Sequence, residues 1–316
     1  MNRKKSRFLS LCLLLIGTML DSCMPVQRLE TTKIEPSPHL VIMSAFEPEL
    51  AQLLSQTNVV DTYLINGRTY HVGELAGSKV VLILSGVSMV NAAMTTQTVL
   101  DHFEIDGIIF SGIAGGVNPG LNIGDVVVPA QWGQYQEQTF ARETENGWDA
   151  GRSVSEFGNY EMMFPQYLSV TQKDSQPDTE EQRFWFPVSQ DMLRVAKGLS
   201  DEAQLSDCTQ TKLCLDQQPR AVVGGNGVSG PTFVDNASYR EWVWQTFRAD
   251  ALDMESAAVA HVAYVNKVPF IAFRSLSDLA GGGPGKNEIS TFFQLAADNS
   301  AKVVIAFLEK LPEPRE

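Results

Sequence analysis

Four side chains that could take part in acid–base chemistry lie next to apolar segments of the chain. Glu49 follows a first apolar run, and Arg274 and Asp278 follow the short apolar run VPFIAF. Glu255 lies just before an alanine- and valine-rich stretch with helical spacing. Ligands of open α/β sheets bind beyond the carboxyl ends of the strands, so these positions favour a shared polar site.

Each of these residues also has a purely structural explanation. A carboxylate in the first turn of a helix interacts favourably with the helix dipole, and an Asp after a strand commonly caps a turn. The combination is more informative than any single residue, because Glu255 and Asp278 flank one predicted strand and Arg274 lies between them in the sequence.

Apolar runs of strand length alternate with helical patterns from residue 40 onward. Strands are expected at 40–45, 79–84, 108–110, 123–129, 184–187, 221–230 and 268–273, with a hairpin over 63–77 around Asn66-Gly67. Helices are expected at 50–54, 89–103, 189–199, 239–247, 254–266 and 291–310. This alternation predicts a single α/β domain with a twisted, mixed central β-sheet flanked by helices.

Two segments are expected to be irregular. The small residues of SGIAGG (111–116) form the predicted exit loop of a strand, where backbone could approach a ligand closely. This spacing is neither a dinucleotide fingerprint nor a P-loop. Residues 131–182 are polar and aromatic with few periodic runs, which favours long loops that serve as a lid or a subunit contact.

The composition is that of a globular protein with ample material for a core. The chain has 316 residues, of which 44% are hydrophobic, and its formal net charge is −13. A surface of this sign repels nucleic acids and anionic membranes, so no nucleic-acid partner is expected.

The first residues have the layout of an export signal. Residues 1–22 combine a basic start with an apolar core too short for a membrane span, and they end before Cys23. The sequence before Cys23 resembles a bacterial lipoprotein cleavage site, although Asp21 departs from that pattern. We expect a tether over 23–39, a catalytic domain over 40–316 and a lipid anchor at Cys23 in the cell envelope or periplasm. Simple secretion and an uncleaved anchor are the alternatives.

Two further cysteines lie close together in a polar segment. Cys208 and Cys214 could close a small loop as a disulfide in an oxidising compartment. The alternative is a metal site, but additional Cys or nearby His ligands are missing from the sequence around them.

Several segments together resemble the nucleoside phosphorylase superfamily, and within it the methylthioadenosine/S-adenosylhomocysteine nucleosidase branch. The similarity is carried by VIMSAFEPEL, NGRTYHVGELAGSKVVLILSGVSMVNAA, IIFSGIAGGVNPGLNIGDVVVP, SGPTF and LDMESAAVAHVAYVNKVPFIAFRSLSD. The segment at about 131–220 is divergent. The resemblance implies a homodimer that needs no metal and no organic cofactor.

The resemblance also implies roles for the polar residues. Glu49 matches the general base that activates water, and Asp278 matches the acid that protonates the purine at N7. Glu255 and Met254 match the pair that holds the ribose. Arg274 matches a residue that orients water or charge near Glu255.

The remaining matched positions form the expected pocket. Ser277 lies beside the acid, Phe233 stacks on the base, and the backbone of Val234 reads the edge of the base. Pocket-wall positions are Val87, Ala114 and Gly115. Ile113 departs from the branch, which can carry a hydroxyl residue there.

Three functions remain after these assignments. N-glycosidic hydrolysis of an adenine-type, possibly 5′-substituted, purine nucleoside is favoured, because Glu49 would repel phosphate. A phosphorylase would place arginines around the phosphate, but the first arginine after Val41 is Arg68, within the predicted hairpin. A nucleoside-binding or storage protein is the third candidate, although it would need none of Glu49, Glu255 and Asp278.

Overall fold

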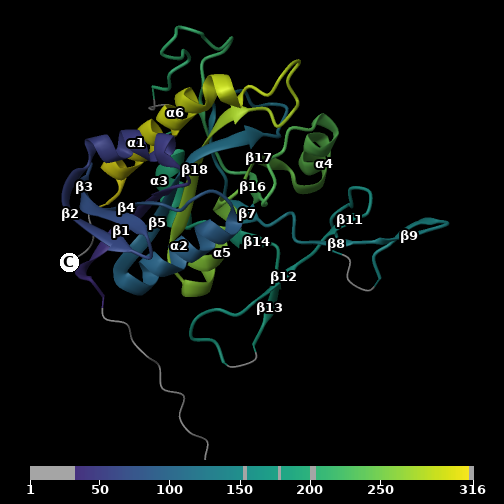
Figure 1. The fold of residues 1–316 in the computed structure, drawn as a ribbon, viewed down its shortest axis with the longest axis horizontal. Helices are drawn as coiled ribbons and strands as arrows, with labels where there is room; N and C mark the ends of the chain where they lie inside the picture. Colours follow the sequence, from purple (N-terminus) through teal and green to yellow (C-terminus); the bar gives the residue numbers. More distant parts are fainter. Residues whose placement is uncertain (1–32, 152–154, 177–178, 200–203, 313–316) are drawn as a thin grey trace, which may run out of the picture. The chain divides into compact units, whose positions relative to one another are not determined.

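A mixed β-sheet forms the centre of the protein (Figure 1). The computed structural model describes residues 33–151, 155–176, 179–199 and 204–312. The expected signal segment and Cys23 lie outside these ranges. Along the main path of the sheet the strands are β14 (Trp185–Pro187), β7 (Gln131–Gly133), β16 (Asn226–Ser229), β17 (Ala249–Asp253), β5 (Phe103–Gly116), β1 (Glu35–Ser44), β4 (Ser78–Leu84), β3 (Arg68–Leu75) and β2 (Asn58–Ile65).

Three more strands branch from this path. β18 (Phe270–Asp278) pairs with β5 in parallel and with β6 (Val126–Val128) in antiparallel orientation, and β6 pairs with β15 (Ala221–Val223). Parallel pairs such as β1 with β4 and β5 occur beside antiparallel pairs such as β2 with β3. The predicted mixed sheet in a single α/β domain is therefore confirmed.

Helices cover both faces of the sheet. α1 and α6 pack against each other, with α6 also against β5 and β18, whereas α2 and α5 pack together on the opposite face (Figure 1). The helices are α1 (Glu47–Gln56), α2 (Met89–His102), α3 (Gln190–Lys197), α4 (Ala237–Phe247), α5 (Ser256–Asn266) and α6 (Ile289–Lys310). No helix in the described parts of the chain is long and apolar enough to cross a membrane.

Local sequence explains several of these elements. Asn66 and Gly67 both have positive φ, 51° and 75°, as the predicted two-residue hairpin turn requires. Val80 to Ile83 are almost fully buried, because β4 is a central strand with both faces covered. Ser189 caps α3 by accepting a hydrogen bond from the Met192 N–H at 3.4 Å, as expected.

The sheet begins earlier than expected. β1 starts at Glu35, so residues 35–39, expected to belong to a tether, pair with β5 through Glu35–Phe103 and His39–Ile105. The strand gains its second neighbour, β4, only from Leu40 onward. The first part of β1 is thus an edge, where the proline-containing sequence is tolerated.

Two expected loops are strands instead. The predicted exit loop 111–116 continues β5, and Arg274, Ser277 and Asp278, expected beyond the strand end, continue β18. The two strands pair from Phe270–Ile108 to Asp278–Gly115. This long pairing supplies the hydrogen bonds that the small and polar residues of both segments need when buried.

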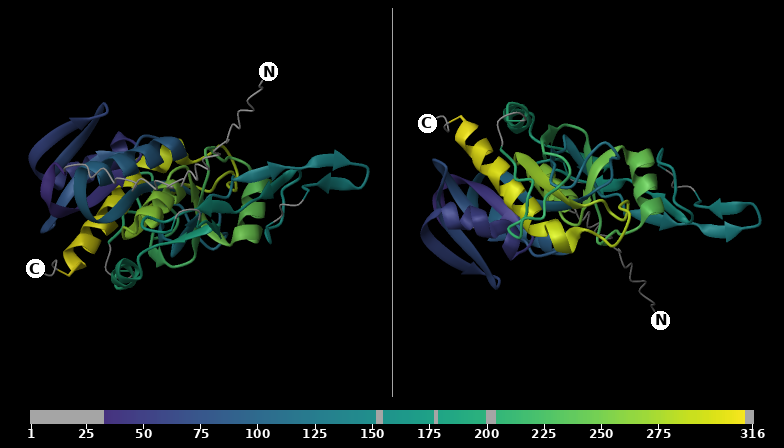
Figure 2. Two further views of the ribbon diagram at one scale, coloured as in Figure 1. Left: turned by 90° about the horizontal axis from the view of Figure 1, so that it is seen from below. Right: turned by 90° about the horizontal axis from the view of Figure 1, so that it is seen from above.

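The divergent segment is more regular than expected. Residues 131–182, expected to be loops, contribute β7 to the central sheet and also form strands of small two-stranded sheets. β14 and β15 match the strands expected at 184–187 and 221–230. The β9–β10 hairpin projects away from the central sheet (Figures 1 and 2). Cys208 and Cys214 are joined in a disulfide. The small strands are β8 (Gln138–Phe140), β9 (Arg142–Thr144), β10 (Gly147–Asp149), β11 (Met163–Pro165), β12 (Leu168–Val170) and β13 (Glu181–Arg183).

Candidate active site

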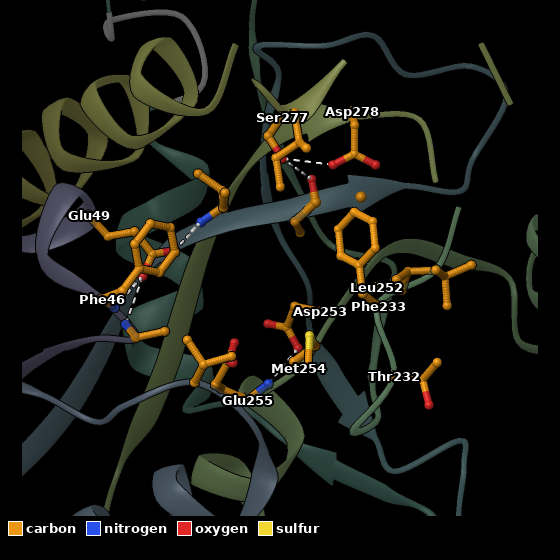
Figure 3. A pocket seen from close by; sticks show the side chains of 17 residues that line it. Phe46, Glu49, Thr232, Phe233, Leu252, Asp253, Met254, Glu255, Ser277 and Asp278 are labelled. Carbon is orange, nitrogen blue, oxygen red and sulfur yellow. Dashed lines mark hydrogen bonds between the residues drawn. The ribbon is translucent and has the colours of Figure 1, made fainter. Parts of the chain in front are cut away.

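The polar residues meet in one pocket at the carboxyl ends of β1, β5 and β18 and beside the start of α5 (Figure 3). The pocket has a cavity volume of ≈ 200 Å³. Its wall consists of Ala45, Phe46, Glu49, Val87, Ile113, Ala114, Gly115, Thr232, Phe233, Val234, Leu252, Asp253, Met254, Glu255, Ser277, Asp278 and Ile289.

Glu49 is held by backbone N–H groups at one side of the pocket. Its Oε2 accepts hydrogen bonds from Ala45 N at 2.7 Å and Phe46 N at 3.3 Å, and its Oε1 accepts one from Ile113 N at 2.8 Å. Burial raises the pKa of the Glu49 carboxyl, and the Arg274 charge and these N–H groups lower it in part. Glu49 is therefore a fixed carboxylate with increased basicity.

Arg274 lies fully buried behind the pocket and pairs with three carboxylates. Its Nε is 2.7 Å from Asp253 Oδ2, its Nη2 is 3.5 Å from Glu255 Oε2, and its Nη1 is 3.7 Å from Glu49 Oε1. Phe110 stacks under the guanidinium, with 4.1 Å from Cζ to the ring centroid. Arg274 thus neutralises part of an otherwise strongly acidic cluster and fixes its geometry.

Asp253 connects this cluster to the start of α5. Its Oδ1 accepts hydrogen bonds from the N–H groups of Glu255 and Ser256, each at 3.2 Å, and from the hydroxyl of Ser229. Its Oδ2 accepts a hydrogen bond from Ser256 Oγ at 2.5 Å. Glu255 is the N-cap residue of α5, but its side chain makes no capping hydrogen bond. Asp253 caps the helix instead, so the Glu255 side chain is available to the pocket.

Glu255 lines a third part of the pocket, below both Glu49 and Asp278 in the view of Figure 3. Its Oε1 accepts a hydrogen bond from Ser88 N at 2.7 Å. The pKa of Glu255 is raised to about 7: burial is the largest cause and the charges of Asp253 and Glu49 add to it, while Arg274 and the Ser88 N–H partly offset the rise. A carboxylate with this pKa could accept hydrogen bonds from hydroxyl groups near neutral pH.

Asp278 lies on the other side of the pocket, at the end of β18. It accepts hydrogen bonds from Ala280 N and Ser277 Oγ, both at 2.8 Å, and from Asn287 Nδ2 at 3.3 Å. Burial raises the pKa of Asp278, and these three donors lower it in part. A carboxyl group with a raised pKa can hold a proton for transfer to a leaving group.

The apolar part of the pocket lies between these polar groups. Phe233 has 52% of its surface exposed, and its ring lies close to Asp278 (Figure 3). Met254 and Val87 line the side near Glu255, and Ala114 and Gly115 line the side near Asp278. A flat, apolar ligand group could stack on Phe233 while its polar edge faces Asp278.

The structure brings most of the expected site residues into one place. Ten of them line the pocket, and Arg274 supports it from behind. Sequence reasoning missed Asp253, although its position two residues before Glu255 in the strand preceding the helix was a usable signal. It also missed Phe46, Thr232 and Ile289 in the pocket wall. Within the described residues, no group of three or more His, Cys, Asp or Glu is arranged to hold a metal ion.

The fold and the pocket define a member of a known family. Residues 39–309 match the phosphorylase superfamily, and the chain belongs to that superfamily.

Two kinds of protein are similar to this chain in sequence. The chain is 31% identical over 271 residues to a 5′-methylthioadenosine/S-adenosylhomocysteine nucleosidase of Tolumonas auensis, a match that covers 85% of this chain and 98% of the relative. It is 28% identical to bark storage protein A of Populus deltoides over 79% of this chain and 80% of that protein.

Solved structures have the same fold. One is a 5′-methylthioadenosine/S-adenosylhomocysteine nucleosidase from S. pneumoniae with a transition-state inhibitor (TM-score 0.62, 26% identity, 86% of this chain and 99% of that chain). Another is such a nucleosidase from Colwellia psychrerythraea in complex with adenine (TM-score 0.64, 27% identity, 87% of this chain and 96% of that chain).

Proposed function

We propose that this protein hydrolyses the N-glycosidic bond of a purine nucleoside, with adenine as the base and a 5′-substituent such as methylthio on the sugar. The observation that carries the proposal is the placement of two buried carboxyl groups, Glu49 and Asp278, on different sides of one pocket that Glu255 also lines (Figure 3). The nucleosidases among the relatives support the same reaction.

The reaction assigns one task to each carboxyl group. Asp278 gives its proton to N7 of the base, and the bond between the base and C1′ breaks with its electron pair moving to the base. Positive charge then develops on the sugar, and hydrogen bonds from the sugar hydroxyls to Glu255 strengthen. Glu49 removes a proton from a water molecule as that water attacks C1′. The products are the free base and the free sugar.

The charge of the pocket favours water over phosphate as the nucleophile. None of the described residues that line the pocket is Lys, Arg or His, whereas Glu49, Asp253, Glu255 and Asp278 all contribute to its wall. Arg274 already pairs with three of these carboxylates. A phosphate dianion would meet net negative charge, and this repulsion is strong in a buried site.

Free-base release from a panel of nucleosides tests the proposal. Purified protein is incubated with adenosine, 5′-methylthioadenosine, inosine and uridine, and the free bases are separated by chromatography. The proposal predicts adenine release from the adenine nucleosides and much slower release from uridine, and it predicts loss of release in Asp278→Asn. Absence of base release from every nucleoside in the wild type would contradict it.

A second candidate is nucleoside binding without turnover, which the similarity to bark storage proteins favours. The same panel, combined with calorimetric binding of each nucleoside, separates the two. Binding of adenosine that is equal in the wild type and Asp278→Asn, with no base released by either, would support the binding function.

We further propose a homodimer. The outer side of α2 supports it, because Val90 and Met94 are 71% and 61% exposed and could be covered by a second copy. Light scattering of the purified protein should give twice the mass of one chain, and a single-chain mass at micromolar concentration would contradict the proposal.

A further inference from the structure

The turn between β4 and α2 has an unusual backbone at the edge of the pocket. Gly86 has φ 78°, and Ser88 has φ 82° with ψ 160°. Only glycine adopts the second of these conformations readily, so a serine there is held by its surroundings. Such held conformations are concentrated at functional sites.

This turn contacts the proposed sugar-binding carboxylate directly. The Ser88 N–H donates to Glu255 Oε1 at 2.7 Å, and Val87 lines the pocket. The orientation of the Ser88 N–H depends on the φ angle of Ser88. The conformation of the turn therefore determines the position at which Glu255 accepts this hydrogen bond.

Arg68 reaches this turn from the neighbouring hairpin. Arg68 is the first residue of β3, yet its Nη1 donates to Leu84 O at 3.2 Å and its Nη2 donates to Asn91 Oδ1 at 3.1 Å. A Cβ atom at Gly86 would lie 3.1 Å from both Arg68 nitrogens, so the guanidinium lies against the turn backbone. Its function is therefore not confined to the hairpin turn that the sequence suggested.

Asn91 links Arg68 to Val87, the residue before Ser88. Its Nδ2 donates to Val87 O at 2.7 Å, while its Oδ1 accepts the bond from Arg68. The other carbonyls of the turn have local donors. Ser85 O accepts from Thr95 Oγ1, Gly86 O from Ser85 Oγ and Ser88 O from Ala92 N.

We propose that Arg68 is a positioning residue for sugar binding: with Asn91 it holds residues 85–88 in the conformation that keeps the Ser88 N–H on Glu255. The inference rests on the proposed function, in which Glu255 binds the sugar hydroxyls. Arg68 itself is separated from the pocket by the turn and does not contact the substrate.

Steady-state kinetics of Arg68→Met with an adenine nucleoside test this inference. The substitution keeps an unbranched apolar side chain and removes the donors, so kcat/KM should fall about tenfold or more because Glu255 is misplaced. In a Glu255→Ala background, which lacks the acceptor for the Ser88 N–H, the same substitution should change kcat/KM less than about twofold, because the two act through one contact. Lys79→Met, which removes an exposed cation from β4, is the matched control and should keep wild-type kinetics.

Two results would overturn the inference. One is wild-type kcat/KM in folded Arg68→Met, and the other is an equal loss of kcat/KM in the wild-type and Glu255→Ala backgrounds. If Arg68→Met fails to fold, Asn91→Ala replaces it, since Asn91 is an exposed residue.

An NMR measurement separates this inference from the proposed function. In ¹⁵N-labelled protein, the Ser88 amide proton should move upfield in Arg68→Met because its hydrogen bond to Glu255 lengthens. An unchanged Ser88 resonance would overturn the inference even in a protein without nucleosidase activity. Lack of nucleoside cleavage by the wild type, with the Ser88 shift present, would contradict the proposed function only.

Discussion

Burial raises the pKa of three carboxyl groups in the pocket, but their hydrogen-bond partners differ. Glu49 accepts hydrogen bonds from three backbone N–H groups, Asp278 accepts one backbone N–H and two side-chain donors, and Glu255 accepts the Ser88 N–H. Glu49 and Glu255 both face Arg274. Carboxyl groups in different environments can serve as base, acid and sugar ligand within one site. The three residues can therefore be distinguished by substituting them one at a time.

Removing the proposed acid or base should affect the rate more than the fold. Asp278→Asn and Glu49→Gln are each expected to lower kcat about 10²–10⁴-fold, the usual contribution of a positioned acid or base. Glu47→Gln, two residues before Glu49 on the exposed side of α1, is the control and should leave kcat unchanged. Steady-state kinetics on variants with wild-type circular dichroism check this. A decrease in kcat of less than about threefold would show that the substituted residue is not the acid or base of the reaction.

The pH dependence of stability should report the pKa of Glu255. Because its folded-state pKa is raised from 4.5 to about 7, its contribution to stability is fully present below pH 4.5 and is lost as the pH rises through about 7. The charged groups that face it are Arg274, Asp253 and Glu49.

The Glu255→Gln variant isolates this contribution. The melting temperature of the wild type minus that of Glu255→Gln should decrease as the pH rises from 4.5 to about 7. Thermal unfolding followed by circular dichroism at several pH values measures the difference. A difference that is constant across this range would contradict the raised pKa.

Sequence patterns identified the carboxyl groups of the site but not how they are linked. Glu49, Glu255 and Asp278 could be assigned because each lies at the end of a recognisable apolar or helical run and matches a family motif. Asp253 was missed because a single Asp before a helix is an ordinary capping residue, although its position two residues before Glu255 was a usable signal. Its ion pair with Arg274 is formed between β17 and β18, two strands that are separated by α5 and do not pair with each other.

At the scale of elements, strand lengths were the least predictable feature. The segments SGIAGG and RSLSD contain small and polar residues that are typical of loops, yet both are buried strand ends that pair with each other. Pairing between distant segments, rather than local propensity, determines their structure. The helices and the Asn66-Gly67 hairpin were easier to predict because helical spacing of apolar residues and the turn residues are local signals.

The close pairing of β5 and β18 explains why residue 112 is a glycine. A methyl group at Gly112 would overlap Arg274 Nη1 and Glu49 Oε1. Gly112→Ala should therefore displace the catalytic base, lower kcat/KM by at least about tenfold and destabilise the fold by about 1–3 kcal/mol. Gly285→Ala, where nothing lies within 4 Å of the added Cβ, is the control. Wild-type kinetics in Gly112→Ala would show that Glu49 need not occupy this position.

At the scale of the whole molecule, the family fold contains the pocket, and none of the residues that line the pocket belongs to the divergent segment. The disulfide in that segment closes a loop with a sequence separation of 6, and neither cysteine lines the pocket. Replacing both Cys208 and Cys214 by serine should lower the free energy of unfolding by about 2 kcal/mol and leave kcat unchanged. Denaturant unfolding and kinetics measure the two quantities. A loss of activity without loss of stability would assign the loop a role in the reaction.

The first residues support a proposal about the cellular location of the protein. We propose export and lipid attachment at Cys23, which the lipoprotein-like cleavage site supports. In a bacterial expression host, metabolic labelling with a radioactive fatty acid should label the wild type and not Cys23→Ala. Equal labelling of both, or labelling of neither, would contradict lipid attachment at this residue.

Product analysis with and without phosphate tests the central claim most directly. The account predicts that the protein releases adenine and free sugar from an adenine nucleoside at the same rate in phosphate-free buffer and in millimolar phosphate, because Glu49 activates water in a pocket whose charge repels phosphate. Cleavage that requires phosphate and yields a sugar 1-phosphate would contradict the account.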